Sequence, residues 1–213
     1  MADTMHRTRA ITSPKTRSVE RHDLRGLLEP ESLLARHGTA IARTCLPCLR
    51  AIDSGASPES RARQEQVHRK ALEFMLSRSV TAPGLQAIGE ALDEALAASP
   101  DDGVIEACLA ALIDTRVKLP HNLPVYLEAL IYDLRDESFP PAVVAAACQR
   151  IRRESVFLPE VSEVLAMCRE TLARYREQRQ RVAAALTDRR KAELWLKELD
   201  HSAEAETDAH PRT

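Results

Sequence analysis

Apolar residues recur every three or four positions along most of the chain from Pro30 onward, which places them on one side of successive α-helices. The clearest stripes are Leu34, Ile41, Cys45, Leu49 and Ile52, then Leu85, Ile88, Leu92 and Leu96, and later Leu123, Leu127, Leu130, Ile131 and Leu134. No segment shows the sustained alternation of apolar and polar residues that a half-buried strand requires. The pattern therefore predicts helices and no sheet.

The longest stripe begins after Pro159 and predicts a helix of about forty residues, reaching Leu199. Its apolar members are Val161, Val164, Leu165, Cys168, Leu172, Tyr175, Val182, Leu186, Trp195 and Leu199. The stripe thins between Arg176 and Arg181, where no residue is apolar. A helix that is polar on all sides is either solvated or bound to a partner, so this stretch is a candidate contact region.

Prolines and capping residues indicate where helices begin and bend. Ser57 followed by Pro58 predicts a helix start, and Ser99-Pro100-Asp101-Asp102 predicts another. Pro47 lies within the first stripe and predicts a kink, because it has no N–H and clashes with the preceding turn. The loop over 115–124 carries two prolines and is expected to be exposed.

Two packing arrangements are expected for the first half of the chain. The helix after Ser57 is very polar and is expected on the surface. Its only coherent apolar face consists of Val67, Ala71, Phe74 and Met75. The stripe ending at Leu96 and the one running from Val104 to Leu112 are expected to form an antiparallel hairpin.

Composition agrees with an all-α fold. Of the 213 residues 44% are hydrophobic but only 3% are aromatic, so the core is built from small aliphatic side chains. We predict an irregular helical bundle with a long C-terminal helix and disordered termini. The expected organisation is a flexible basic arm (1–28), an N-terminal helical region (29–118), a second helical region (119–175), a basic helix extension (176–200) and a flexible tail (201–213).

Charge and cysteine content limit the class of protein. The formal net charge of −2 provides no global attraction to nucleic acid. No run of eighteen apolar residues predicts a transmembrane helix, and the polar stretch from Met1 to Gly26 does not look like a secretory signal. The five cysteines are irregularly spaced, unlike a disulfide framework, so a cytoplasmic location is expected.

The motif Cys45-Leu46-Pro47-Cys48 is the most specific candidate for chemistry. It could be a redox pair or half of a metal site, but no strand precedes it and no second ligand pair matches it. Buried core thiols are the favoured interpretation of all five cysteines, including Cys108, Cys148 and Cys168. The histidines form no HExxH pattern, and phosphate-binding glycine loops are absent. We therefore predict no enzyme, no cofactor and no metal.

Basic residues concentrate near the C-terminus and form the candidate partner- or nucleic-acid-binding site. They are Arg169, Arg174, Arg176, Arg179, Arg181, Arg189, Arg190 and Lys191, against Glu170, Glu177 and Asp188 in the same stretch. Arginines along a helix can contact phosphates. The alternative is a solvated helix face with no partner. Because aromatic residues are scarce here, any contact with DNA would be to its backbone.

One part of the chain resembles a known family. Val125-Tyr126-Leu127-Glu128-Ala129-Leu130 leads to Phe139-Pro140-Pro141, and Phe157-Leu158-Pro159-Glu160-Val161-Ser162-Glu163-Val164 follows. This stretch, about residues 122–172, resembles the helical domain of phage helicase loader/inhibitor proteins. Those have an aromatic-led helix, a helix of small apolar residues and a Phe-x-Pro turn opening the next helix. Here Phe157 is expected to pack against that first turn, with Pro159 setting its φ.

The resemblance implies a non-enzymatic DNA-replication accessory protein of phage or prophage type. It would bind a replicative helicase or initiator, or another replication protein, and contact DNA through its backbone. The alternative is a helical structural or scaffolding protein that forms a weak homodimer through its long C-terminal helix. That seam would consist of Cys168, Leu172, Tyr175, Val182 and Leu186. A third hypothesis, a sequence-specific DNA-binding regulator, lacks a clear turn before a recognition helix.

Overall fold

The protein is all-α in the computed structural model, which describes residues 24–49, 52, 55–116, 118–119 and 121–208. The helices are α1 (Leu24–Leu27), α2 (Glu29–Arg43), α3 (Pro58–Arg78), α4 (Ala82–Ala97), α5 (Asp102–Ile113), α6 (Leu123–Asp136), α7 (Pro141–Glu154) and α8 (Val161–Asp208). No strand occurs among these residues, which confirms the predicted fold class. None of the helices in this part of the chain combines the length and apolar character needed to cross a bilayer.

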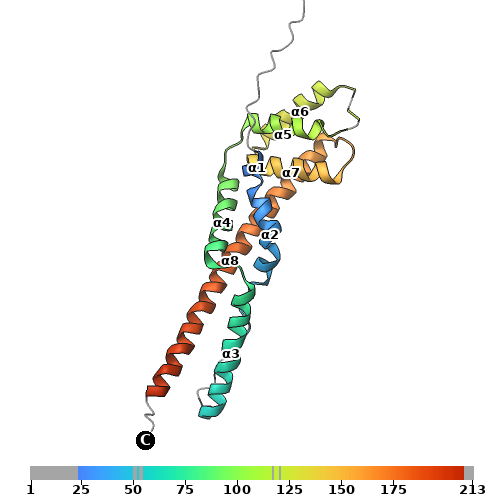
Figure 1. Ribbon diagram of the computed structural model, residues 1–213. Helices are drawn as coiled ribbons and strands as arrows, with labels where there is room; N and C mark the ends of the chain where they lie inside the picture. The colour runs from blue at the N-terminus through green and yellow to red at the C-terminus, as the bar shows by residue number, and fades with distance from the viewer. Residues whose placement is uncertain (1–23, 50–51, 53–54, 117, 120, 209–213) are drawn as a thin grey trace, which may run out of the picture.

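Helix α8 is the axis of the molecule. Its 48 residues span about 72 Å, and the other helices pack at different levels along it (Figure 1). At one end α5, α6 and α7 gather around the start of α8 and form what we call the head. Helices α2 and α4 pack along its middle. Towards the other end α3 alone accompanies α8; residues 58–78 and 186–202 form what we call the arm.

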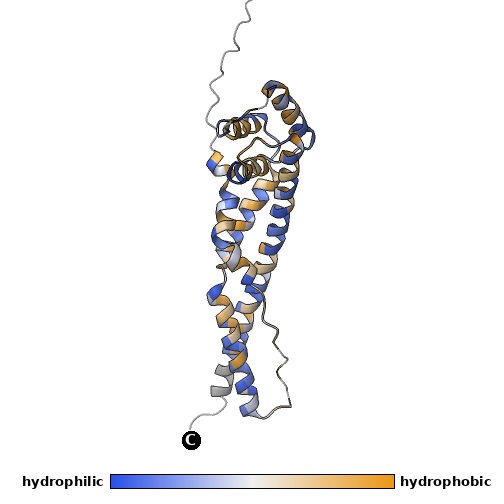
Figure 2. Ribbon diagram, turned by 90° about the vertical axis from the view of Figure 1, so that its right-hand side faces the viewer, coloured by the Kyte–Doolittle hydropathy of each residue, from blue (hydrophilic) through white to orange (hydrophobic). Residues whose placement is uncertain are grey.

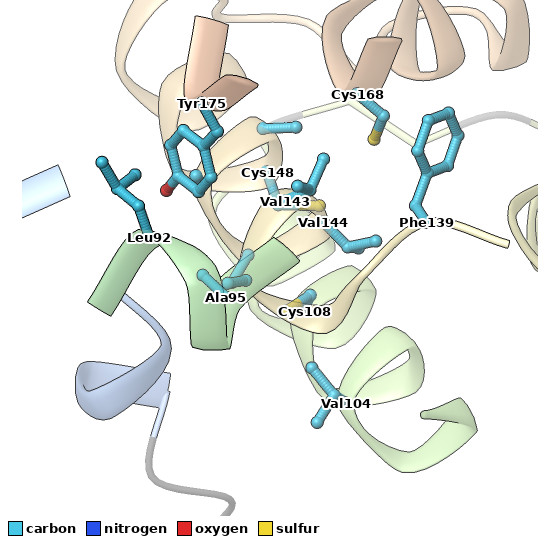
Figure 3. Close-up of a cluster of buried hydrophobic side chains, with 14 of the residues drawn as sticks. Leu92, Ala95, Val104, Cys108, Phe139, Val143, Val144, Cys148, Cys168 and Tyr175 are labelled. Atoms are coloured by element: carbon cyan, nitrogen blue, oxygen red, sulfur yellow. The ribbon is translucent and has the colours of Figure 1, made fainter. Parts of the chain in front are cut away.

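One hydrophobic core joins the head to the middle of the molecule. It extends from Ile41 in α2 to Ala185 in α8, so it crosses the predicted boundary at residue 119. Tyr175 and Phe139 are its largest fully buried side chains, and Figure 3 shows them around α7 with the thiols of the head. Helix α7 contributes mainly small residues, with Ala142, Ala145, Ala146 and Ala147 all buried. Small side chains allow the helices to approach closely, which explains a core with so few aromatic residues.

The arm has its own small core. Leu72 and Met75 of α3 and Ala192 of α8 are buried there, with Leu196 and Leu199 partly buried beside them. Hydrophilic residues cover much of the remaining surface of these two helices (Figure 2). The structure confirms that α3 is a polar helix, but its predicted packing face was wrong in part. Val67 and Phe74 point to solvent, and Leu72 takes their place against α8.

Helix boundaries follow the local signals closely. Ser57 Oγ accepts a hydrogen bond from the Ser60 N–H at 3.3 Å, and Asp101 Oδ1 accepts one from the Val104 N–H at 3.1 Å. Both predicted starts are therefore confirmed. Two terminal boundaries differ from the prediction. Residues 24–27 are helical instead of belonging to the basic arm, and α8 continues through the expected tail to Asp208. The rest of the predicted basic N-terminal segment and of the predicted tail, residues 1–23 and 209–213, lies outside the described residues.

The path of the chain corrects two further expectations. Helix α2 ends at Arg43 instead of bending at Pro47, so the segment after it is not helical. Helices α4 and α5 do not form a hairpin, because α4 packs along α8 while α5 packs on α7 (Figure 1). Helices α4 and α5 each bury their apolar stripe against a helix that is distant in sequence. This burial determines their packing more than the short connection between the two helices does.

The turn before α8 is held differently from the expectation. The Phe157 side chain is 64% exposed, so it does not pack against the first turn of the helix. Leu158 packs against the core instead, and the Tyr126 hydroxyl donates a 2.8 Å hydrogen bond to the Pro159 carbonyl. The Glu163 carboxylate accepts a 2.8 Å hydrogen bond from the Glu160 N–H, which satisfies a free donor at the helix start.

Candidate functional site

The eight basic residues predicted as a binding site do not form one surface. Three of them connect α8 to other helices: Arg169 pairs with Glu137 after α6, Arg174 with Glu31 of α2, and Arg179 with Asp93 of α4. The last pair is bidentate, with N···O distances of 2.6 and 2.7 Å. These hydrogen bonds hold the pKa values of Glu137 and Asp93 below their ordinary values. Because these arginines are paired with carboxylates elsewhere in the chain, they are not free to bind a partner.

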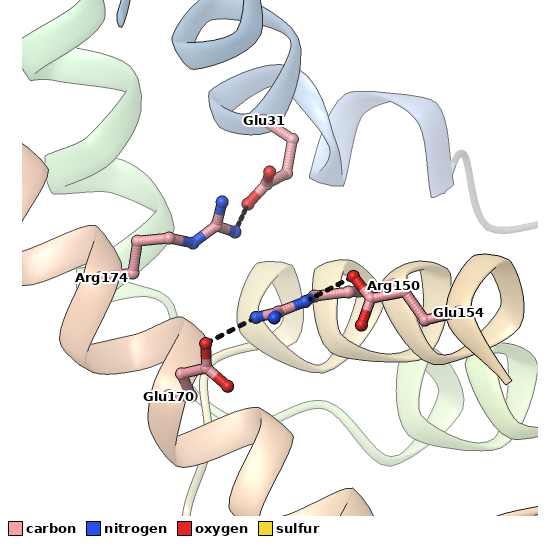
Figure 4. A network of polar contacts seen from close by, with 5 residues as sticks. All are labelled: Glu31, Arg150, Glu154, Glu170 and Arg174. Carbon is pink, nitrogen blue, oxygen red and sulfur yellow. Dashed lines mark hydrogen bonds and ion pairs between the residues drawn. The ribbon is translucent and has the colours of Figure 1, made fainter.

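The contact of Arg174 belongs to a polar group where α2, α7 and α8 meet (Figure 4). Arg174 reaches Glu31 from one side of α8. Close by, the Arg150 guanidinium donates to Glu154 at 2.9 Å and to Glu170 at 2.7 Å, which links α7 to α8. The pairs of Arg150 are half exposed and that of Arg174 with Glu31 is partly buried, so the pairs of Arg150 contribute little to stability.

Arg181 and Arg189 also have partners within the chain. Arg181 pairs with Glu177 one turn earlier on α8 at 2.5 Å. Arg189 is nearly buried, and its guanidinium donates to the Leu76 carbonyl at 3.3 Å, the Val80 carbonyl at 3.2 Å and the Ser79 hydroxyl. It therefore caps the C-terminal end of α3, where helix carbonyls lack partners of their own.

The remaining three residues, Arg176, Arg190 and Lys191, are exposed and have no ion pair within the described part of the chain. They lie on the side of α8 turned away from its buried stripe. Lys197 shares this side, is also exposed, and has no ion pair among the described residues. The sequence pattern missed it because it lies beyond the run of basic residues that ends at Lys191. Its spacing of two helical turns from Arg190 could have identified it. We call these four residues the basic face of α8.

The seam proposed for a homodimer lies inside the protein. Cys168, Tyr175 and Val182 are at most 1% exposed, and Leu172 and Leu186 pack against the same core. Helices α2, α4 and α7 of the same chain cover this stripe, so a second copy cannot use it. The prediction of self-association through these residues was wrong.

The motif containing Cys45 and Cys48 was expected inside a helix with buried thiols. It lies instead in the segment after α2, and both thiols are exposed. The Leu46 N–H between them donates a 3.3 Å hydrogen bond to Asp188 of α8. Among the residues that the structure describes, no group of three or more His, Cys, Asp or Glu side chains is arranged to hold a metal ion.

The other cysteines are buried, as predicted. Burial raises the pKa of the Cys108 thiol to about 11 and that of Cys168 to about 12, and it also raises the pKa of the Cys148 thiol well above its ordinary value. Because the thiolate is the reactive form, these three groups are inert at neutral pH.

Thiol titration tests this division of the cysteines. With Ellman's reagent at pH 8, two thiols are expected to react in a fast phase and the other three only after unfolding in guanidinium. A Cys45→Ser, Cys48→Ser variant should lose the fast phase completely. A fast phase that survives in that variant would contradict the burial of the remaining thiols.

Comparison with known proteins gives no relative for this chain: no protein-family model, no curated protein and no solved structure matches it.

Proposed function

We propose that the protein is a non-enzymatic DNA-replication accessory protein of phage or prophage type, which binds a replicative helicase or initiator through the basic face of α8. The observation that carries the proposal is that Arg176, Arg190, Lys191 and Lys197 are exposed on one side of α8, with no acidic partner among the residues that the structure describes. The neighbouring arginines of α8 pair with carboxylates of the same chain. These four bases are therefore the ones left available to a partner. Binding through these four residues breaks none of the ion pairs formed by the described residues.

The shape and charge of this face suit an extended acidic surface. Arg176 and Lys197 are about 32 Å apart along the helix axis, so a partner must present negative charge over several helical turns. An acidic protein surface or a DNA backbone can supply negative charge over this length. The likeness of residues 122–172 to helicase loaders supports a replication partner. All five cysteines are free thiols, which accords with a reducing cytoplasm.

Charge reversal tests the proposal more sharply than truncation. Removing α8 from residue 176 would take away Val182 and Ala185, which belong to the main core, so loss of binding would be ambiguous. The triple variant Arg176→Glu, Arg190→Glu, Lys191→Glu changes only exposed side chains. Immobilised wild-type protein is expected to retain a replicative helicase or initiator from an extract of the source cells, identified by mass spectrometry. The triple variant should retain about tenfold less.

A matched control has the same change in net charge. Arg36→Glu, Arg43→Glu, Arg153→Glu reverses three exposed bases on α2 and α7 and should leave recovery of the helicase or initiator unchanged. Equal loss in both variants would indicate a general charge effect and contradict the assigned face. Recovery that survives in the α8 variant would remove the basis of the proposal.

Binding to DNA is tested separately with a purified duplex. If the basic face contacts the backbone, the logarithm of the binding constant should fall with the logarithm of salt concentration with a slope of about −3. The triple variant should bind too weakly to measure at low salt. A duplex that binds both proteins equally would exclude this face as a DNA contact and leave the protein partner.

A further inference from the structure

Helix α3 presents an unpartnered face in which apolar and basic side chains alternate. Val67 and Phe74 are 59% and 60% exposed and lie two turns apart, about 10 Å along the helix. Lys70 lies between them, and Arg78 lies one turn beyond Phe74, with its guanidinium 4.5 Å from the ring centroid. Leu72 and Met75 pack this helix onto α8, which leaves the opposite face open to solvent.

Helix α6 in the head presents a face of the same form with the opposite charge. Val125 and Tyr132 are 56% and 69% exposed, again two turns apart. Glu128 lies between them and Asp136 lies one turn beyond Tyr132, both exposed. Leu130 and Leu134 pack α6 onto the core from the other side.

The two faces match position by position. Counted from the valine, the first charged residue, the aromatic residue and the second charged residue follow at the same spacing on both helices. Lys70 therefore corresponds to Glu128, and Arg78 to Asp136. Within the described part of the chain none of these four charged groups takes part in an ion pair. When the aliphatic and aromatic side chains of the two faces are placed against each other, Lys70 and Glu128 meet at the centre. This holds whether the helices run parallel or antiparallel.

We propose that the protein associates with itself head to tail, with α3 of one copy packed on α6 of the next. The occupant of each face is a second copy, because the chain itself carries the complementary charges at the complementary spacing. The two helices lie towards opposite ends of the elongated molecule, so they do not meet within one chain (Figure 1). When each copy contacts the next in this head-to-tail manner, the assembly extends into an open chain or closes into a ring.

The association is weak and depends on concentration. A single pair of helices with two large apolar side chains on each side is a small interface, of the kind that forms transient complexes. Complementary charges at the centre select the correct pairing, since like charges placed there would repel. The assembly uses neither the basic face of α8 nor the buried seam, so it is independent of the proposed replication function.

Charge exchange at the central pair tests the interface. Sedimentation velocity of the wild-type chain is expected to show species larger than the monomer that grow with concentration. Lys70→Glu and Glu128→Lys each place like charges opposite one another and should weaken association by at least about tenfold. The double variant restores opposite charges and should associate like the wild type. An equimolar mixture of the two single variants should also associate, because each then offers a compatible face to the other.

Arg36→Glu provides the matched control, since it makes the same change in charge at an exposed position on α2, outside both faces. It should leave association unchanged. Circular dichroism should show equal helix content in all variants. Several outcomes would overturn the proposal: a wild-type chain that stays monomeric at high concentration, single variants that associate normally, or a double variant that stays as weak as the single ones. The last would point to a foreign helix as the occupant of these faces.

Discussion

Tyr175→Ala is expected to lower the free energy of unfolding by about 3–5 kcal/mol, as is usual for large aromatic side chains removed from a core. The Tyr175 ring is fully buried where α8 passes α4 and α7, beside Leu92 (Figure 3). The truncation would leave a cavity at the junction between the head and the middle of the molecule. Urea unfolding monitored by circular dichroism measures the loss.

Two control variants separate the effect of core packing from that of the hydroxyl group and from that of removing an exposed tyrosine ring. The Tyr175 hydroxyl is buried and makes no hydrogen bond of normal geometry among the described residues. Burial, and after it the nearby Glu31 carboxylate, raises the pKa of Tyr175 above its ordinary range. Tyr175→Phe should therefore stay within about 1 kcal/mol of the wild type. Tyr132→Ala removes a ring that is 69% exposed and should cost little. Comparable losses from Tyr132→Ala and Tyr175→Ala would contradict the packing described for α8.

Arg189→Leu is expected to cost about 2–3 kcal/mol and to loosen the arm selectively. The guanidinium is the only link described between α8 and the carbonyls of Leu76 and Val80 at the end of α3. Leucine fills similar space but removes the donor to the Val80 carbonyl and one of the two donors to the Leu76 carbonyl, which also accepts from the Ser79 hydroxyl at 3.1 Å. A partly buried acceptor that loses its donor lowers stability. Hydrogen exchange should therefore accelerate in α3 while α5 and α7 keep their protection.

The neighbouring residue supplies the control for this prediction. Arg190→Leu makes the same chemical change at an exposed position without an ion pair, and its effect should lie within about 0.5 kcal/mol of zero. If the two variants were equally stable, the capping role of Arg189 would be wrong. The comparison also distinguishes an arginine that holds the fold from one that is available to a partner.

Much of the secondary structure is local information, and the sequence predicted it well. Ser57 and Asp101 start their helices because each side chain satisfies a backbone N–H three residues ahead. The length of α8 follows from an apolar stripe that continues on both sides of its polar stretch. The scarcity of aromatic residues correctly indicated helices packed through small side chains.

Which helices meet depends on contacts between distant residues. The short link between α4 and α5 suggested a hairpin, yet α4 makes its most extensive contacts with α8. On α3 two overlapping apolar sets were available, and only the position of α8 selected Leu72 over Val67 and Phe74. The same selection left these two side chains exposed for the proposed self-association.

The sequence by itself determined that the chain is helical, where most helices begin, and that positive charge collects on α8. Only the tertiary structure decided which of those charges are free. Arg189 and Arg190 are adjacent and chemically identical, but a rotation of about 100° along the helix turns one towards α3 and the other towards solvent. That distinction depends on the neighbouring helix, which no local pattern specifies.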